Sequence, residues 1–126
     1  MSERFTIAGR LKALTFALRG FAALWKGEPT TRFHAVGSIA AIGAGWWLGL
    51  ERWEWAFVIA MIGLVWFAEA VNTSLERLAD AVTLEHHPLI GLSKDVASAA
   101  VLIISITALM TGLVVFGPYL SNMIGK

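Results

Sequence analysis

The sequence predicts an all-α integral membrane protein, with three transmembrane helices and an N-terminal amphipathic surface helix in one domain over residues 1–126. The chain is 57% apolar, its mean hydropathy is +0.69, and 15% of its residues are charged. A soluble domain carries about 25% charged residues. Three runs, at residues 33–50, 55–68 and 96–120, contain no Asp, Glu, Lys or Arg. The net charge of +1 indicates no nucleic-acid partner, and the lack of cysteine excludes disulfides and thiolate metal sites.

Residues 1–29 are expected to form the surface helix and the turn after it. Apolar side chains recur at spacings of 4, 3, 4, 3 and 4, as on one helix face: Ile7, Leu11, Leu14, Leu18, Phe21 and Trp25. Basic side chains outnumber acids over residues 1–32: Arg4, Arg10, Lys12, Arg19, Lys26 and Arg32 against Glu3 and Glu28. Such a helix lies in the membrane interface, and packing within the helix bundle is the alternative. Pro29 disfavours helix at Glu28, which predicts a turn that presents this carboxylate at the membrane surface.

The membrane helices are expected at residues 33–50, 55–84 and 94–120. The first would span about 27 Å, and its glycines favour close approach of a neighbouring helix: Gly37, Gly43, Gly45 and Gly49. Trp46, Trp47, Trp53 and Trp55 surround the turn at 51–54 like an aromatic belt. In the loop before the third helix, Pro88 and Gly91 are expected to break helical structure and Ser93 to cap the next helix.

The distribution of basic residues predicts the orientation. Six precede the first membrane helix and one, Arg52, lies in the turn after it. The positive-inside rule therefore places the N-terminus in the cytoplasm, and three crossings place the C-terminus outside. The polar side chains at the other ends of the helices then meet at the cytoplasmic interface: Glu28, Glu69, Glu76, Asp80, Lys94 and Asp95.

An acidic stripe follows the second apolar run. Glu69, Asn72, Glu76 and Asp80 are 3, 4 and 4 residues apart, so the three carboxylates lie within roughly 40° on one helix face. A carboxylate at the position of Glu69 is costly in lipid unless it is paired, hydrated or bound to a cation. The stripe predicts a divalent-cation site, a general base, or both. Solvated acids beyond the membrane, or a buried ion pair between helices, are the structural alternatives.

Carboxylates, a loop lysine and apolar surface at one membrane face suit phosphoryl transfer to a lipid hydroxyl. Mg²⁺ needs one or two carboxylates beside phosphate oxygens, a lysine can bind phosphates, and another carboxylate can accept the proton of the hydroxyl. The sequence contains no Walker loop and no protein-kinase signature. An ion-coupled carrier with Glu69 as its proton site, and a non-catalytic structural subunit, remain alternatives.

These residues resemble a known family, the small prokaryotic membrane kinases that phosphorylate diacylglycerol or undecaprenol. The most specific motif, Glu-x-x-Asn-Thr/Ser-x-x-Glu-x-x-x-Asp, is met by Glu69, Asn72, Thr73, Glu76 and Asp80. A second, Lys-Asp followed by small residues and Ala-Val-Leu, is met by residues 94–102. A weaker match includes Gly20, Trp25, Glu28, Arg32 and His34. Together the matches extend over nearly the whole chain.

The resemblance implies a homotrimer in the bilayer that binds ATP and Mg²⁺ at its cytoplasmic interface, in sites shared between subunits. It implies that Glu69 is the catalytic base and that Glu28 and Glu76 bind the metal. The implied nucleotide-binding residues are Arg10, Glu28, Glu76, Glu85, His87, Lys94 and Asp95. The implied lipid contacts are Glu69, Ser98 and Trp25, with Asn72 and Asp80 in support.

One segment departs from the family pattern, and other segments differ in which members of the family they are similar to. The segment after Glu28 often reads Arg-Asn-Phe-Arg in the family, whereas here it is Pro-Thr-Thr-Arg at residues 29–32. Residues 53–55, the His-Pro pair at 87–88 and residues 111–118 look more like the undecaprenol kinases, whereas residues 98–101 look more like the diacylglycerol kinases. Both lipids therefore remain open as acceptors.

Overall fold

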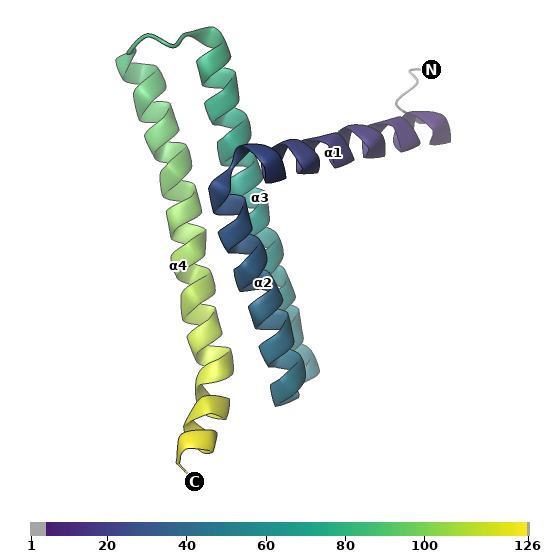
Figure 1. The fold of residues 1–126 in the computed structure, drawn as a ribbon, viewed down its shortest axis with the longest axis vertical. Coiled ribbons are helices and arrows are strands. Elements are labelled where there is room, and N and C mark those ends of the chain that lie inside the picture. The colour runs from purple at the N-terminus through teal and green to yellow at the C-terminus, as the bar shows by residue number, and fades with distance from the viewer. Residues whose placement is uncertain (1–4, 126) are drawn as a thin grey trace.

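The computed structural model describes residues 5–125, which form four helices (Figure 1). They are α1 (Ile7–Gly27), α2 (Pro29–Leu48), α3 (Arg52–Val82) and α4 (Pro88–Ile124). The all-α class is thus confirmed for this part of the chain. Arg4 and Glu3, which belong to the predicted basic segment, lie outside the described residues.

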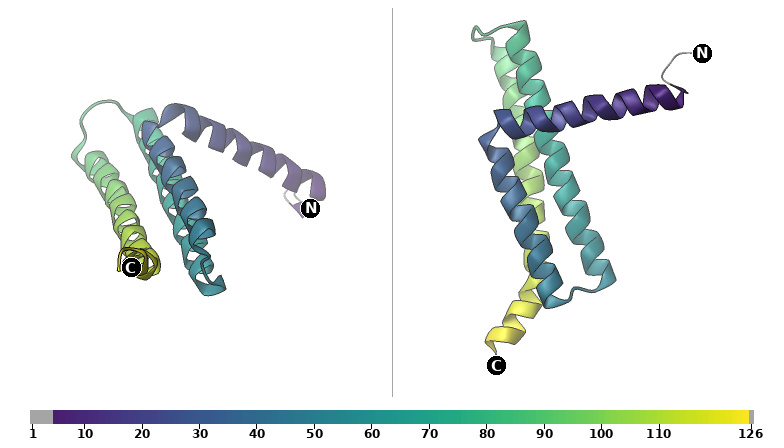
Figure 2. Two further views of the ribbon diagram at one scale, coloured as in Figure 1. Left: turned by 60° about the horizontal axis from the view of Figure 1, so that its bottom comes forward. Right: turned by 45° about the vertical axis from the view of Figure 1, so that its right-hand side comes forward.

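Helix α1 leaves the other three at a steep angle. Helices α2, α3 and α4 run side by side along the long axis, whereas α1 projects to one side near one end (Figures 1 and 2). Thr6 caps α1, because its side chain accepts a hydrogen bond of 3.0 Å from the Gly9 N–H. Leu24 is buried near the end of α1, while Ile7 is 82% exposed. This geometry suits a helix that lies along a membrane surface while its neighbours cross it.

A single non-helical residue, Glu28, separates α1 from α2. Its backbone is extended, with φ −123° and ψ 110°, and Pro29 is the first residue of α2. Proline is favoured at the first helical position, because the N–H that it lacks would have no partner within the helix there. The predicted break at Glu28 is therefore confirmed, but α2 begins four residues before the predicted boundary of residue 33. The turn is fixed by the Thr31 hydroxyl, which donates to the Leu24 carbonyl at 3.2 Å.

Close helix approach in α2 is found at one of its glycines. A methyl group at Gly45 would lie 2.9 Å from the Trp55 ring, whereas Gly37 and Gly43 have nothing within 4 Å among the described residues. Gly49 has a different role: its φ of 71° ends α2 in the left-handed conformation that glycine tolerates. Among residues 5–125, a close neighbour is thus found at Gly45, and the close approach expected at Gly37 and Gly43 stays a prediction.

Among residues 5–125, α3 and α4 are the two helices long and apolar enough to cross a membrane. They have 31 and 37 residues and run antiparallel as the main packed pair (Figure 1). The start predicted for the third membrane helix is wrong, because α4 begins at Pro88 and Ser93 lies inside it, donating to the Leu89 carbonyl at 3.0 Å. Proline at a first helical position starts α4 rather than breaking it. The helix also continues past Pro118, its predicted end region.

A polar cluster joins the α2–α3 turn to α4 at the end of the bundle away from α1. Glu54 is buried, and its Oε1 accepts hydrogen bonds from the Tyr119 hydroxyl at 2.6 Å and from the Glu51 N–H at 3.2 Å. Glu51 and Glu54 also form the capping box that starts α3. Leu50, Val58 and Val115 form the small apolar core beside this cluster.

Candidate active site

The Glu69 carboxylate is buried where the start of α2 crosses α3. Glu69 is 5% exposed. Its Oε1 accepts a hydrogen bond of 2.8 Å from the Thr30 hydroxyl, and its Oε2 lies 3.4 Å from His34 Nε2. Burying a carboxylate is costly unless it is hydrogen-bonded or paired, and these two side chains of α2 meet that requirement in part. The solvated reading of Glu69 is therefore excluded.

His34 is itself held by a short hydrogen-bonded chain. The Ser38 hydroxyl donates to the His34 carbonyl at 2.7 Å, and Trp66 Nε1–H donates to the Ser38 hydroxyl at 2.9 Å. The His34 and Trp66 rings lie 6.5 Å apart at 57°. The hydrogen bonds thus link the His34 backbone to Trp66 of α3, and the imidazole itself lies between the Trp66 ring and Glu69.

The rest of the acidic stripe continues along α3 toward the α3–α4 loop. Asn72 Oδ1 and the Thr73 hydroxyl are buried and have no hydrogen-bond partner among residues 5–125. Glu76 is half-buried, and Asp80 is exposed. Unpartnered buried oxygens are uncommon in native proteins and call for an explanation such as an ion or water. The stripe therefore offers oxygen ligands that the described chain does not use.

Lys94 of α4 pairs with the last carboxylate of the stripe. Its Nζ lies 2.5 Å from Asp80 Oδ1, with both side chains partly exposed. The neighbouring predicted site residues are all exposed, on the α3–α4 loop or the first turns of α4: Glu85, His87, Asp95 and Ser98. The predicted nucleotide-binding residues of α3 and α4 thus share one end of the bundle.

The predicted site residues before α2 divide into two groups. Glu28 is half-buried at the α1–α2 corner, and Trp25 is exposed one turn before it. Arg77 of α3 reaches this corner, donating to the Ala23 carbonyl at 3.2 Å. Arg10, however, lies 18 residues before Glu28, about 27 Å along α1. Within one chain, α1 therefore carries Arg10 away from the stripe (Figure 1). Among residues 5–125, no three His, Asp or Glu side chains form a metal-binding group.

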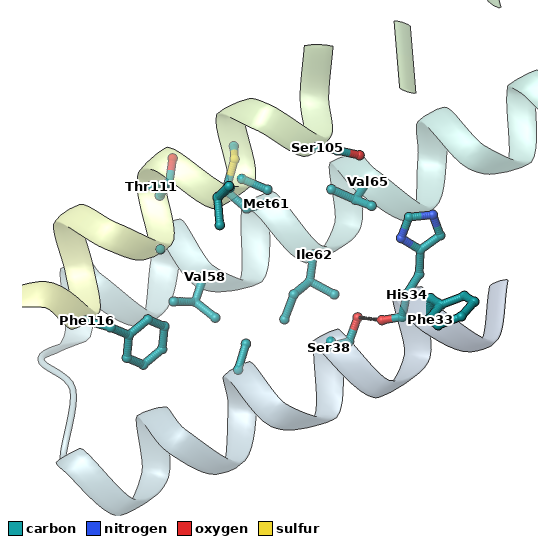
Figure 3. Close-up of a pocket in the computed structure, with 15 residues that line it drawn as sticks. Phe33, His34, Ser38, Val58, Met61, Ile62, Val65, Ser105, Thr111 and Phe116 are labelled. Atoms are coloured by element: carbon teal, nitrogen blue, oxygen red, sulfur yellow. Dashed lines mark hydrogen bonds between the residues drawn. The ribbon is translucent and has the colours of Figure 1, made fainter. Parts of the chain in front are cut away.

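An apolar groove of about 400 Å³ runs between α2 and α4 over α3. Figure 3 shows His34 and Ser38 toward one end and Phe116 toward the other, with Val58, Ile62 and Val65 of α3 between them. The groove is therefore apolar along most of its length, and its polar end is the imidazole that contacts Glu69.

The sequence reasoning missed Thr30, Ser38 and Trp66. A signal for two of them was present, because Thr30, His34 and Ser38 are spaced four residues apart and so share one face of α2. Polar side chains on one face of an apolar helix indicate a polar partner on the next helix, here Glu69 and Trp66 of α3.

Comparison with known proteins identifies a family for this chain. The family model described as prokaryotic diacylglycerol kinase matches residues 15–116. Undecaprenol kinase of Bacillus subtilis (strain 168) is 32% identical over 109 residues, covering 86% of this chain and 89% of the relative. Diacylglycerol kinase of Escherichia coli (strain K12) is 33% identical over 101 residues, covering 80% and 83%, and that of Pseudomonas aeruginosa is 36% identical over 90 residues, covering 71% and 73%. With its buried α3 carboxylate and long apolar helices, this chain belongs to the prokaryotic diacylglycerol kinase family of integral membrane proteins.

Proposed function

We propose that this protein is an ATP- and Mg²⁺-dependent lipid kinase that phosphorylates the hydroxyl of a membrane lipid alcohol at the cytoplasmic interface. The observation that carries the proposal is the Glu69 carboxylate, buried among apolar helices and hydrogen-bonded by Thr30. The names of the relatives give undecaprenol and diacylglycerol as substrates. Both are lipids with a free hydroxyl, and the groove beside His34 is apolar as their tails require.

Glu69 acts as the general base. It takes the proton of the lipid hydroxyl as the hydroxyl oxygen bonds to the γ-phosphorus of ATP and the bond from that phosphorus to the β-phosphate oxygen breaks. ADP leaves, and the phosphorylated lipid remains in the membrane. Such proton transfer contributes about 10²- to 10⁴-fold to a rate. Trp25 and Ser98 contact the lipid at the interface.

Glu28 and Glu76 hold Mg²⁺ in this proposal. Mg²⁺ is usually bound by one or two carboxylates together with phosphate oxygens, so two carboxylates are enough for this role. Asn72 Oδ1, which is buried and has no hydrogen-bond partner within residues 5–125, adds a fitting oxygen one turn before Glu76. The ion would neutralise charge on the phosphates during transfer.

Lys94 and Asp95 bind the phosphates of ATP, with Glu85 and His87 beside the nucleotide. Lys94 must then exchange its contact with Asp80 for phosphate oxygens, which is easy for a partly exposed pair. Arg10 lies too far along α1 to reach the nucleotide held by its own α4. We therefore propose a homotrimer in which Arg10 serves a neighbouring subunit, and the exposed apolar faces of the helices support such an assembly.

The angle between α1 and the bundle supports a proposal for the membrane topology. We propose that the chain forms one domain, that α1 lies on the cytoplasmic surface and that α2 joins α3 and α4 as a third crossing. The described C-terminal end of α4 lies at the end of the bundle opposite the α1–α2 corner (Figure 1). The N-terminus and the site are then cytoplasmic, and the C-terminus is outside.

The test is a phosphate-transfer assay in detergent–lipid micelles. Purified protein with Mg²⁺ and ATP is given diacylglycerol and undecaprenol separately, and the ratio of the two rates identifies the acceptor. Glu69→Gln should lower turnover by about 10²- to 10⁴-fold while assembly is kept, and Glu76→Gln should raise the Mg²⁺ concentration needed. Glu51→Gln, an exposed carboxylate at the far end of the bundle, is the matched control.

Other outcomes would support other functions. Transfer to neither lipid, together with pH-driven ion flux in liposomes without ATP, would identify a carrier that uses Glu69 as its proton site. Loss of assembly on neutralising Glu69, again without transfer, would identify a structural subunit.

A further inference from the structure

We propose that Thr30 is a positioning residue that anchors Glu69 through Oε1, so that Oε2, beside His34, is the oxygen that takes the proton. This inference rests on the proposed role of Glu69 as base, and it divides that role between the two oxygens of one carboxylate.

The Oε1 atom is already engaged. The Thr30 hydroxyl donates to it at 2.8 Å, a normal length for a hydrogen bond between a hydroxyl and a carboxylate oxygen. A hydrogen bond to a charged acceptor is roughly twice as strong as a neutral one. Thr30 is on the first turn of α2, fixed by Pro29 and by the Thr31 hydroxyl bond to Leu24. The donor is therefore held by backbone structure rather than by a mobile loop.

The Oε2 atom is held much less firmly. His34 Nε2 lies 3.4 Å from it, beyond the usual range of about 2.7–3.2 Å for a hydrogen bond from nitrogen. The Ser38 hydroxyl donates to the His34 carbonyl, and the Trp66 ring lies 6.5 Å from the imidazole. His34 also lines the apolar groove (Figure 3). Oε2 is thus the oxygen next to a side chain that lines the groove, and its contact with His34 is longer than the bond that Thr30 makes to Oε1.

The orientation of the proton-accepting oxygen therefore depends on Thr30 of α2, a residue outside the acidic stripe of α3. If the Thr30 hydroxyl is removed, the carboxylate can rotate about its last side-chain bond, and the two oxygens lose their separate roles. Misplacement of a reacting group by about 1 Å costs roughly 10²-fold in rate. The rotation displaces none of the other side chains proposed to bind ATP or the lipid, so we expect the effect mainly in kcat.

The experiment compares Thr30→Val with Thr30→Ser in the phosphate-transfer assay. Valine has the shape of threonine without the hydroxyl, and we expect kcat to fall about 10- to 100-fold with KM for lipid and ATP unchanged. Serine retains the hydroxyl and should restore most of kcat. The matched control is Thr107→Val, which removes a hydroxyl that donates to the Ile103 carbonyl of its own helix within the described part of the chain, and which should leave kcat unchanged.

A double-mutant cycle separates positioning from folding. If Thr30 acts through Glu69, adding Thr30→Val to Glu69→Gln should cause no further loss. Full activity of Thr30→Val, a further loss in the Glu69→Gln background, or no rescue by serine would overturn the inference. His34→Gln gives a second measurement, since it leaves the Oε1 anchor intact and should lower kcat less than Thr30→Val does. Undiminished turnover of Glu69→Gln alone would instead overturn the assignment of the base.

Discussion

The hydroxyl of Tyr119 is expected to stabilise the fold at the end of the bundle far from Glu69. Tyr119→Phe removes only the donor of the 2.6 Å hydrogen bond to Oε1 of the buried Glu54. A hydrogen bond to a charged group contributes about 1.5–3 kcal/mol. The Glu51 N–H still donates to the same oxygen at 3.2 Å, so the carboxylate keeps one hydrogen bond. We therefore expect the free energy of unfolding to fall by the lower part of that range, about 1.5–2 kcal/mol.

The assay is SDS titration of the detergent-solubilised protein, followed by tryptophan fluorescence. Repeating Tyr119→Phe in a Glu54→Met background removes the acceptor, so the same substitution should there cause a much smaller loss of stability. Turnover of Tyr119→Phe at low temperature should equal that of the unchanged protein. An equal loss of stability in both backgrounds, or a loss below about 0.5 kcal/mol in the first, would refute the reasoning.

Two further substitutions test packing and the nucleotide end. Gly45→Ala places a methyl group 2.9 Å from the Trp55 ring and should lower the free energy of unfolding by about 1–3 kcal/mol. Gly43 has open space around it among the described residues, so Gly43→Ala should leave that free energy unchanged or raise it by up to about 1 kcal/mol in the same titration. Equal effects of the two alanines would contradict the packing of α2 on α3. Asp80→Asn breaks an exposed ion pair with Lys94 and should change stability by less than about 1 kcal/mol, while KM for ATP rises several-fold in the transfer assay. An unchanged KM would remove Asp80 from the site.

Local patterns predicted the helices well and their ends less well. Charge-free runs revealed α3 and α4, and Pro29 correctly marked the break at Glu28. At the start of α4 two signals competed: Pro88 reads either as a breaker or as a first helical residue, and Ser93 reads as a cap. The structure has the proline start, with the Ser93 hydroxyl bonded to its own helix. A residue type that suits both roles cannot be assigned from the local sequence alone.

The acidic stripe was predictable because its members share one helix and one periodicity. The contact between Thr30 and Glu69 was not, because it joins residues 39 positions apart on different helices. The pattern of Thr30, His34 and Ser38 shows that α2 has a polar face, but only tertiary packing decides which residue of α3 meets it. The ion pair between Lys94 and Asp80 could not be predicted either, because it also depends on how two helices pack together.

The chain has little interior of its own. Among residues 5–125, the buried apolar side chains are Leu24, Leu50, Val58 and Val115, whereas Phe33 and Val114 are 77% and 70% exposed. Lipid tails or neighbouring subunits must complete the packing that a soluble protein finds within itself, and water cannot drive that step between helices already inserted. Its resistance to heat or denaturant is thus a joint property of the polypeptide and of the amphiphile around it. Values measured in two detergents describe two different systems, and a change of acyl-chain length can act on this protein as a core mutation acts on a soluble one.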